Sequence, residues 1–164
     1  MTPLEFVQAK RAHAARLANQ SGAAGEVAAV GDHDDWIPRP AGAGLKVLLH
    51  LLREKGLNIK GSSFDAVHVP GIRDLDFADP TAVAAALPTM TFIEIKTASQ
   101  PRVRPGFAGF FFALTEGEII AADVLGSRHR VALFNKLSGE ILMTSVPEIL
   151  ARSKSQNWQL SVQL

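Results

Sequence analysis

Leucine residues recur at intervals of three and four within residues 45–55, which is the spacing of one buried helical face, and Gly56 follows as a stop. This pattern predicts a helix that packs against a core. Two later segments change to the two-residue period of a strand and are rich in residues that favour strands. The sequence therefore predicts strands over residues 63–69 and 90–97.

The long connection between these strands contains Asp79-Pro80-Thr81, which predicts the cap and first turn of a short Ala-rich helix ending at Pro88. An apolar run over residues 109–114 then leads into Thr115-Glu116-Gly117-Glu118. This is a capping box, which predicts a helix up to Leu125 and accounts for Glu118 locally. The last elements expected are a hairpin over residues 130–144, a short helix at Pro147 and a strand over residues 158–162.

The N-terminal part of the chain is predicted to contain helices and a loop. Thr2-Pro3-Leu4-Glu5 forms a capping box with proline at the first helical position, so a helix is expected over residues 2–19. A second, Ala-rich helical piece is expected over residues 23–30. The Asp, Pro and Gly residues of 31–44 indicate a loop, in which Trp36-Ile37 are the only large apolar residues.

These elements predict one mixed α/β domain over residues 1–164, with N-terminal helices and loop over 1–43 and a core over 44–164. Hydrophobic residues make up 47% of the chain and charged residues 20%, which is typical of a folded protein. The 17 basic and 16 acidic side chains give a net charge of only +1. Any affinity for nucleic acid must therefore come from a local basic patch.

The chain contains no cysteine, which excludes disulfides, thiolate zinc sites and a cysteine nucleophile. Its start has no basic region followed by an apolar one, and no apolar run approaches the roughly 18 residues that a membrane span needs. We expect a cytoplasmic protein without a membrane partner. The chain also lacks Gly-x-Ser-x-Gly, His-Glu-x-x-His, P-loop and Gly-x-Gly-x-x-Gly patterns, so other common enzyme classes lack their signatures.

Two charged residues fall within the apolar strand predicted over residues 90–97. Side chains alternate between the faces of a strand, so Glu94 and Lys96 share one face while Ile93 and Ile95 share the other. Charges inside a sheet are costly unless they pair, bind a metal or meet water in a cleft. A carboxylate beside an ammonium group suits phosphodiester hydrolysis, in which carboxylates hold Mg²⁺ and a cation offsets developing negative charge.

A second carboxylate is expected from Asp65 in the preceding strand. If the two strands pair antiparallel about a midpoint near Asp79 and Pro80, Asp65 falls opposite Glu94. The long connection leaves other acidic residues open as substitutes, namely Asp74, Asp76 and Asp79.

These residues resemble the PD-(D/E)XK nuclease superfamily, in which an Asp lies in one strand and Glu-x-Lys in the next. More narrowly, residues 64–141 resemble the domain at the C-terminus of the plant NO VEIN proteins and in many bacterial defence proteins. The segments that carry the resemblance are Phe64-Asp65-Ala66-Val67, Phe92-Ile93-Glu94-Ile95-Lys96-Thr97, Phe112-Ala113-Leu114-Thr115-Glu116-Gly117-Glu118 and His129-Arg130-Val131-Ala132-Leu133-Phe134. The chain departs from the family in having no proline before Asp65 and His129 in place of a tyrosine.

The resemblance implies a restriction endonuclease-like fold, a mixed β-sheet flanked by α-helices. It also implies that Asp65, Glu94 and the main-chain carbonyl of Ile95 hold Mg²⁺, or Mn²⁺, and that Lys96 orients the attacking water. In several branches of the superfamily an early-helix glutamate joins the site, and Glu26 is the candidate here. The implied substrate is nucleic acid, expected to be DNA. The chain would act in restriction or antiphage defence, as a homodimer or with a partner subunit.

Other charged residues have both a functional and a plain interpretation. Arg102 and Arg104, in a Pro-bounded loop after the Lys96 strand, would contact phosphates at the rim of the cleft or form an ordinary solvated loop. Arg128-His129-Arg130 is a second, weaker basic cluster. The acidic run Asp32-His33-Asp34-Asp35 favours a solvated turn, because neighbouring loop residues rarely converge on one ion.

Two hypotheses from different classes remain open. The first is a Mg²⁺-dependent endonuclease. The second is a catalytically inactive nuclease-like module for nucleic-acid binding or protein assembly, in which Glu94 and Lys96 only form an ion pair. Either hypothesis allows the Trp36-Ile37-Pro38 segment and the last strand to dock onto a partner subunit.

Overall fold

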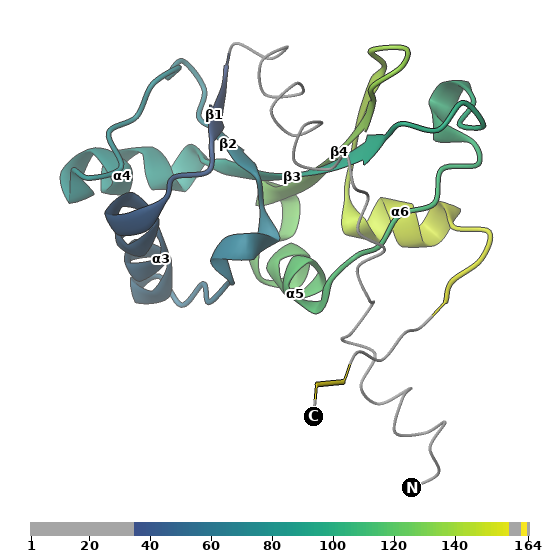
Figure 1. Ribbon diagram of the computed structural model, residues 1–164. Helices are drawn as coiled ribbons and strands as arrows, with labels where there is room; N and C mark the ends of the chain where they lie inside the picture. The colour runs from purple at the N-terminus through teal and green to yellow at the C-terminus, as the bar shows by residue number, and fades with distance from the viewer. Residues whose placement is uncertain (1–34, 158–161, 164) are drawn as a thin grey trace, which may run out of the picture.

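The computed structural model describes residues 35–157 and 162–163 of the chain (Figure 1). The helices expected over 2–19 and 23–30, with Glu26, therefore lie outside the described residues. The same holds for residues 32–34 of the acidic run and for residues 158–161 of the expected last strand.

A mixed five-stranded sheet forms the centre of the fold (Figure 1). Neighbouring strands follow the order of the chain, and every pair is antiparallel except the third and fourth, which are parallel. The predicted α/β class is confirmed. The strands are β1 (Trp36–Pro38), β2 (Ala66–His68), β3 (Thr91–Ala98), β4 (His129–Asn135) and β5 (Ile141–Thr144).

Four α-helices accompany the sheet in the described part of the chain: α3 (Gly42–Glu54), α4 (Pro80–Ala86), α5 (Glu116–Leu125) and α6 (Val146–Arg152). Short 3-10 turns lie at Gly61–Ser63 (η1), Leu87–Thr89 (η2), Pro105–Phe107 (η3) and Gly126–Arg128 (η4). The predicted caps are present, since Asp79 accepts a hydrogen bond from Thr81 N and Thr115 and Glu118 form the capping box of α5. The longest described helix, α3, has 13 residues, and none within residues 35–157 could cross a membrane.

The prediction of a loop over residues 31–44 was wrong at its centre. Trp36–Pro38 forms β1, which pairs antiparallel with β2, and both Trp36 and Ile37 are buried. Three residues are too few for the two-residue period to be visible in sequence. The helix predicted over residues 45–55 is confirmed, but it begins three residues earlier, at Gly42.

One further segment differs from its prediction. The strand expected over residues 63–69 is limited to β2, because η1 turns the chain immediately before it. The apolar run over residues 109–114 has no regular secondary structure. The hairpin of β4 and β5 and the short helix α6 were both predicted correctly.

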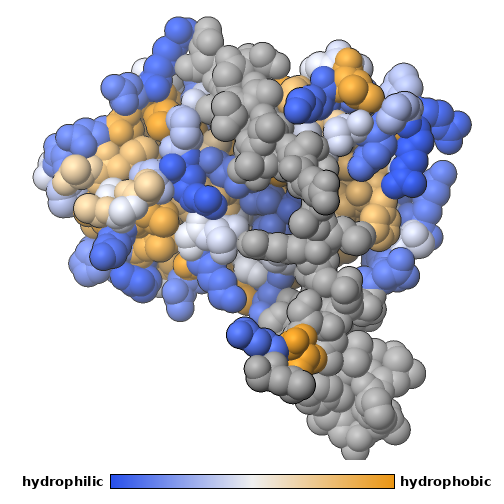
Figure 2. Space-filling view, viewed as in Figure 1, coloured by the Kyte–Doolittle hydropathy of each residue, from blue (hydrophilic) through white to orange (hydrophobic). Residues whose placement is uncertain are grey.

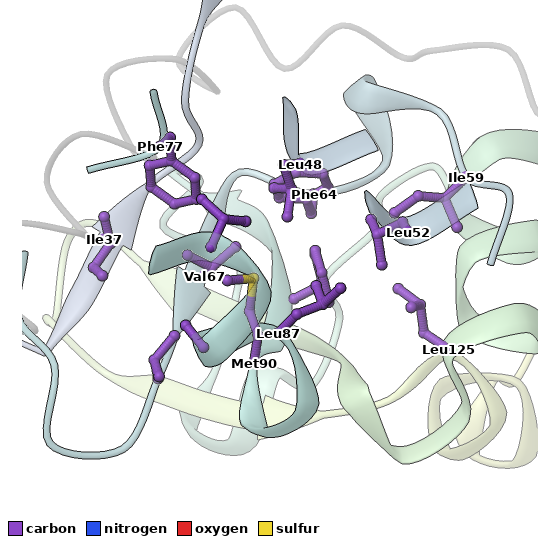
Figure 3. Close-up of a cluster of buried hydrophobic side chains, with 14 of the residues drawn as sticks. Ile37, Leu48, Leu52, Ile59, Phe64, Val67, Phe77, Leu87, Met90 and Leu125 are labelled. Carbon is purple, nitrogen blue, oxygen red and sulfur yellow. The ribbon is translucent and has the colours of Figure 1, made fainter. Parts of the chain in front are cut away.

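The four described helices pack on one face of the sheet. Ile37 of β1, Val67 of β2 and Phe92 of β3 lie in register on this face and belong to one apolar cluster with side chains of α3, α4 and α5 (Figure 3). Within the cluster the rings of Phe64 and Phe92 meet edge to face, with centroids 5.1 Å apart. This packing fixes β2 against β3 immediately beside Asp65.

A second apolar cluster covers the other end of the same face. It contains Ala98 of β3 and Val131 and Leu133 of β4, together with side chains of α5 and α6. Along β3, Glu94 and Lys96 therefore lie between Phe92 of the first cluster and Ala98 of the second. The fold places these two charges between apolar layers, where each needs a partner.

Candidate active site

The side chains of Glu94 and Lys96 meet on the helix-covered face of β3. Lys96 Nζ lies 2.9 Å from Glu94 Oε1, and the two side chains are 14% and 7% exposed. The shared face was predicted from strand alternation. Because both groups are almost removed from water, their mutual attraction is screened little by solvent.

Glu118 joins this pair from the first turn of α5. Its Oε2 atom accepts hydrogen bonds at 2.9 Å from Lys96 Nζ and at 2.9 Å from the backbone N–H of Thr115. The sequence explained Glu118 completely by the capping box, so its second contact was missed. The segment Phe112–Glu118, which already carried the family resemblance, was the feature that could have found it.

Asp65 is the second carboxylate that the fold brings to Glu94. The predicted antiparallel register is present, with Ala66 opposite Ile93. One residue further, Asp65 N donates to Ile93 O and Ile95 N donates to Asp65 Oδ2, both at 2.8 Å. Asp65 thus forms hydrogen bonds with the residues on both sides of Glu94, with Ile93 through its backbone and with Ile95 through its side chain.

Two of the three acidic residues considered as substitutes for Asp65 have local roles. Asp76 Oδ1 accepts from Ala78 N and Asp79 Oδ1 accepts from Thr81 N, each at 2.9 Å. Asp74, Asp76 and Asp79 are all exposed. Asp65 is therefore the carboxylate that the described chain places beside Glu94.

Arg39, which follows β1, is a neighbour of Asp65 that the sequence did not reveal. Its Nη1 atom donates to the carbonyls of Phe64 (2.8 Å) and Gly61 (3.2 Å) and lies 3.9 Å from Asp65 Oδ1. The side chain is 36% exposed, so its charge is partly solvated. Arg39 thus holds in place the backbone that immediately precedes Asp65.

Three carboxylates and two cations make up the site, which leaves one net negative charge when all five are ionised. Burial raises the pKa of Asp65 above its usual value. Burial and then the neighbouring charges of Asp65 and Glu118 raise the pKa of Glu94 well above its usual value, against the opposing effect of Lys96. Burial lowers the pKa of Lys96, but Glu94 and Glu118 outweigh it and raise that pKa overall, so Lys96 is a cation.

The donor set suits a hard divalent cation. Glu94 Oε2 is buried and has no hydrogen-bond donor among the described residues, and the Asp65 carboxylate lies beside it. The N–H and C=O of a strand residue point to the same side, so the Ile95 carbonyl faces the side of Asp65, to which Ile95 N donates. The described residues contain no group of three acidic, His or Cys side chains that could hold a metal, so a cation there would also need carbonyl or water ligands.

The two predicted basic clusters have different surroundings. Arg102 and Arg104 are exposed in the loop between β3 and α5. Arg128 Nη1 instead donates to Leu87 O at 2.9 Å, and Arg130 Nη2 lies 3.8 Å from Glu148 Oε2. His129 is buried, with Nε2 3.1 Å from Ser63 O. The second cluster therefore has structural contacts and its arginines are half-buried, whereas both arginines of the first cluster are exposed.

Comparison of the chain with protein-family models, with curated proteins and with solved structures found no match. The geometry of the site is therefore the basis for assigning a function.

The raised pKa of Glu94 predicts how stability depends on pH. A carboxyl group with a higher pKa in the folded state binds more protons when folded, so its contribution to stability is lost as pH rises from about 4.5 through the folded pKa. We expect the free energy of unfolding in EDTA to fall over this window, and to fall less steeply for Glu94→Gln. Urea denaturation at several pH values measures both slopes. Equal slopes would show that Glu94 titrates normally.

Proposed function

We propose that this protein is a metal-dependent nuclease of the PD-(D/E)XK type that hydrolyses phosphodiester bonds, with DNA as the expected substrate. The observation that carries the proposal is that Asp65 and Glu94 are buried next to each other beside Lys96, with Glu94 Oε2 left without a donor among the described residues. Two adjacent buried carboxylates are unfavourable unless a cation or a proton lies between them. A site of this kind is typical of Mg²⁺-binding centres.

Asp65, Glu94 and the carbonyl of Ile95 would hold Mg²⁺ or Mn²⁺. When bound, such an ion polarises a phosphoryl oxygen and lowers the pKa of a coordinated water. Lys96 is protonated, so it acts as a hydrogen-bond donor and a positive charge. In that form it orients the attacking water and stabilises negative charge that develops on the phosphate. Glu118 keeps the ammonium group in place from α5.

The substrate would enter from the side of the loop that carries Arg102 and Arg104. Both arginines are exposed, and guanidinium groups bind phosphates in paired hydrogen bonds. Such contacts position nucleic acid without reading its sequence. A role in restriction or antiphage defence, as a homodimer or beside a partner subunit, follows from the resemblance alone and is part of the same proposal.

The test is cleavage of plasmid, single-stranded DNA and RNA by the full chain in Mg²⁺ or Mn²⁺, with EDTA as a blank. We expect metal-dependent cleavage that Lys96→Ala abolishes and Lys136→Ala, which changes an exposed lysine of the hairpin turn, leaves unchanged. Circular dichroism would verify that each variant is folded. Absence of cleavage by the wild type, or equal cleavage by a folded Lys96→Ala variant, contradicts the proposal.

The inactive nuclease-like module remains a second candidate because of one observation. Lys96 bridges Glu94 and Glu118 at 2.9 Å each, which is also how an ion-pair network would join α5 to the sheet. A purely structural network accounts for the contact of Asp65 with Glu94 only if a proton lies between the two carboxylates, since Glu94 Oε2 has no donor among the described residues. Binding of nucleic acid without metal-dependent cleavage would favour this candidate.

A further inference from the structure

The loop over residues 99–114 connects the two elements that carry Lys96 and Glu118. It leaves β3 at Ala98, two residues after Lys96, and ends at Thr115, whose N–H donates to Glu118. In Figure 1 the loop forms the right-hand end of the molecule, where Figure 2 shows hydrophilic side chains around a smaller apolar area. Both ends of the loop therefore lie close to the site.

The loop is held in a defined conformation, although its only regular element is the short turn η3. Arg104 N donates to Ala108 O at 3.0 Å, and Gly106 N donates to Glu140 Oε1 at 2.9 Å. Phe107 is buried and has a φ of 62°, in the left-handed region that is unfavourable for a bulky residue. Such strain persists only where surrounding contacts impose it, and it is enriched at binding sites.

Three of the four phenylalanines of the loop pack against one another, and the fourth is exposed. The rings of Phe107, Phe110 and Phe112 contact in series, with centroids 6.0 Å and 4.9 Å apart, and they pack on the second apolar cluster. Phe111 lies between two of them in sequence but is 48% exposed. The packed rings of Phe110 and Phe112 hold the backbone on either side of Phe111, and much of the Phe111 side chain is in contact with solvent.

The charged residues of the same loop indicate which class of ligand it binds. Residues 99–115 include Arg102 and Arg104, both exposed, and no acidic residue. An exposed aromatic ring and exposed arginines on one loop are the chemistry that binds single-stranded nucleic acid, because bases stack on the ring while the arginines hold the backbone. Paired bases inside a duplex do not offer their faces for stacking. The combination therefore favours unpaired nucleotides over intact duplex.

We propose that the loop between β3 and α5 binds unpaired nucleotides, with a base stacked on Phe111 and the flanking phosphates held by Arg102 and Arg104. It delivers single-stranded or frayed nucleic acid to Glu94 and Lys96, a consequence that rests on the nuclease function proposed above. The binding itself does not depend on cleavage.

The test measures binding of a fluorescent oligonucleotide by anisotropy in EDTA, where cleavage is blocked. The wild type should bind a single strand more tightly than the blunt duplex of the same sequence. Phe111→Ala should weaken single-strand binding by about 5- to 150-fold, as expected for one lost stack, without changing its salt dependence. Phe111→Trp should restore the affinity.

Matched variants separate stacking from charge. Arg102→Ala and Arg104→Ala should each lower the slope of log affinity against log salt by about 0.7, the value for one phosphate contact on a single strand. Leu137→Ala, which removes an apolar side chain that is 61% exposed on the hairpin turn, should change nothing. Unchanged binding by Phe111→Ala, or no preference of the wild type for the single strand, overturns the proposal.

This design distinguishes failure of the binding proposal from failure of the nuclease proposal. Asp79→Asn should bind the single strand as the wild type does, because Asp79 is exposed at the start of α4 and lies outside both the loop and the site. If the variants behave as expected but the wild type cuts nothing in Mg²⁺ or Mn²⁺, the binding surface stands and the nuclease function does not. If the wild type cuts but Phe111→Ala binds normally, only the binding surface is wrong.

Discussion

Asp65→Asn and Glu94→Gln are each expected to lower the rate of Mg²⁺-dependent cleavage by at least about 10³-fold, because losing a carboxylate ligand removes several kcal/mol of electrostatic stabilisation. Both substitutions keep the size of the side chain. Both should also weaken Mn²⁺ binding, which isothermal titration calorimetry measures without a substrate. The effect comes from the charge of two groups that the fold holds together through Ile95 N.

Asp79→Asn is the matched control for these variants. Asp79 is exposed and caps α4 through Thr81 N, and asparagine caps a helix about as well as aspartate. This variant should therefore retain wild-type cleavage and wild-type Mn²⁺ binding. Retained cleavage by Asp65→Asn would remove Asp65 from the site, and retained cleavage by both site variants would contradict the metal site altogether.

Lys96→Met is expected to destabilise the fold by about 3–5 kcal/mol at neutral pH, because it leaves buried carboxylates without their counter-charge. Glu94 and Glu118 each lie 2.9 Å from Lys96 Nζ and are 7% and 5% exposed, so water cannot replace the ammonium group. The loss should shrink as pH falls, since the carboxyls can then take up protons. Urea denaturation at about pH 5 and pH 7.5 measures both effects.

Two further variants make this prediction specific. The double variant Lys96→Met/Glu94→Gln should recover part of the lost stability, because it removes one of the uncompensated charges. Lys136→Met, at an exposed position of the hairpin turn, should stay within about 0.5 kcal/mol of the wild type. If Lys96→Met matches Lys136→Met, the three-residue network does not stabilise the fold.

The sequence predicted the centre of the fold and the core of the site from local patterns. Alternation along residues 90–97 placed Glu94 and Lys96 on one face, and the antiparallel pairing about Asp79 and Pro80 brought Asp65 to Glu94. Both results depend on strand periodicity, which a single sequence displays. The capped starts of α4 and α5 were predictable for the same reason, since a cap is read from neighbouring residues.

The contacts that were missed join residues far apart in the chain. Arg39 binds the carbonyl of Phe64, 25 residues away, from a segment that was taken for a loop. Glu118 already had a sufficient local explanation, so nothing in the sequence required a second partner 22 residues away. Tertiary contacts of this kind depend on the sheet order, which local patterns do not determine.

The wide spacing of the site residues along the chain has a consequence for protein synthesis. Arg39, Asp65, Glu94, Lys96 and Glu118 meet only when β2 pairs with β3 and α5 returns the chain to β4. Contacts between distant residues form late, since the intervening chain must first be closed into loops. A nascent chain that has not yet released α5 from the ribosome therefore lacks the Glu118 contact of Lys96 and carries no assembled site.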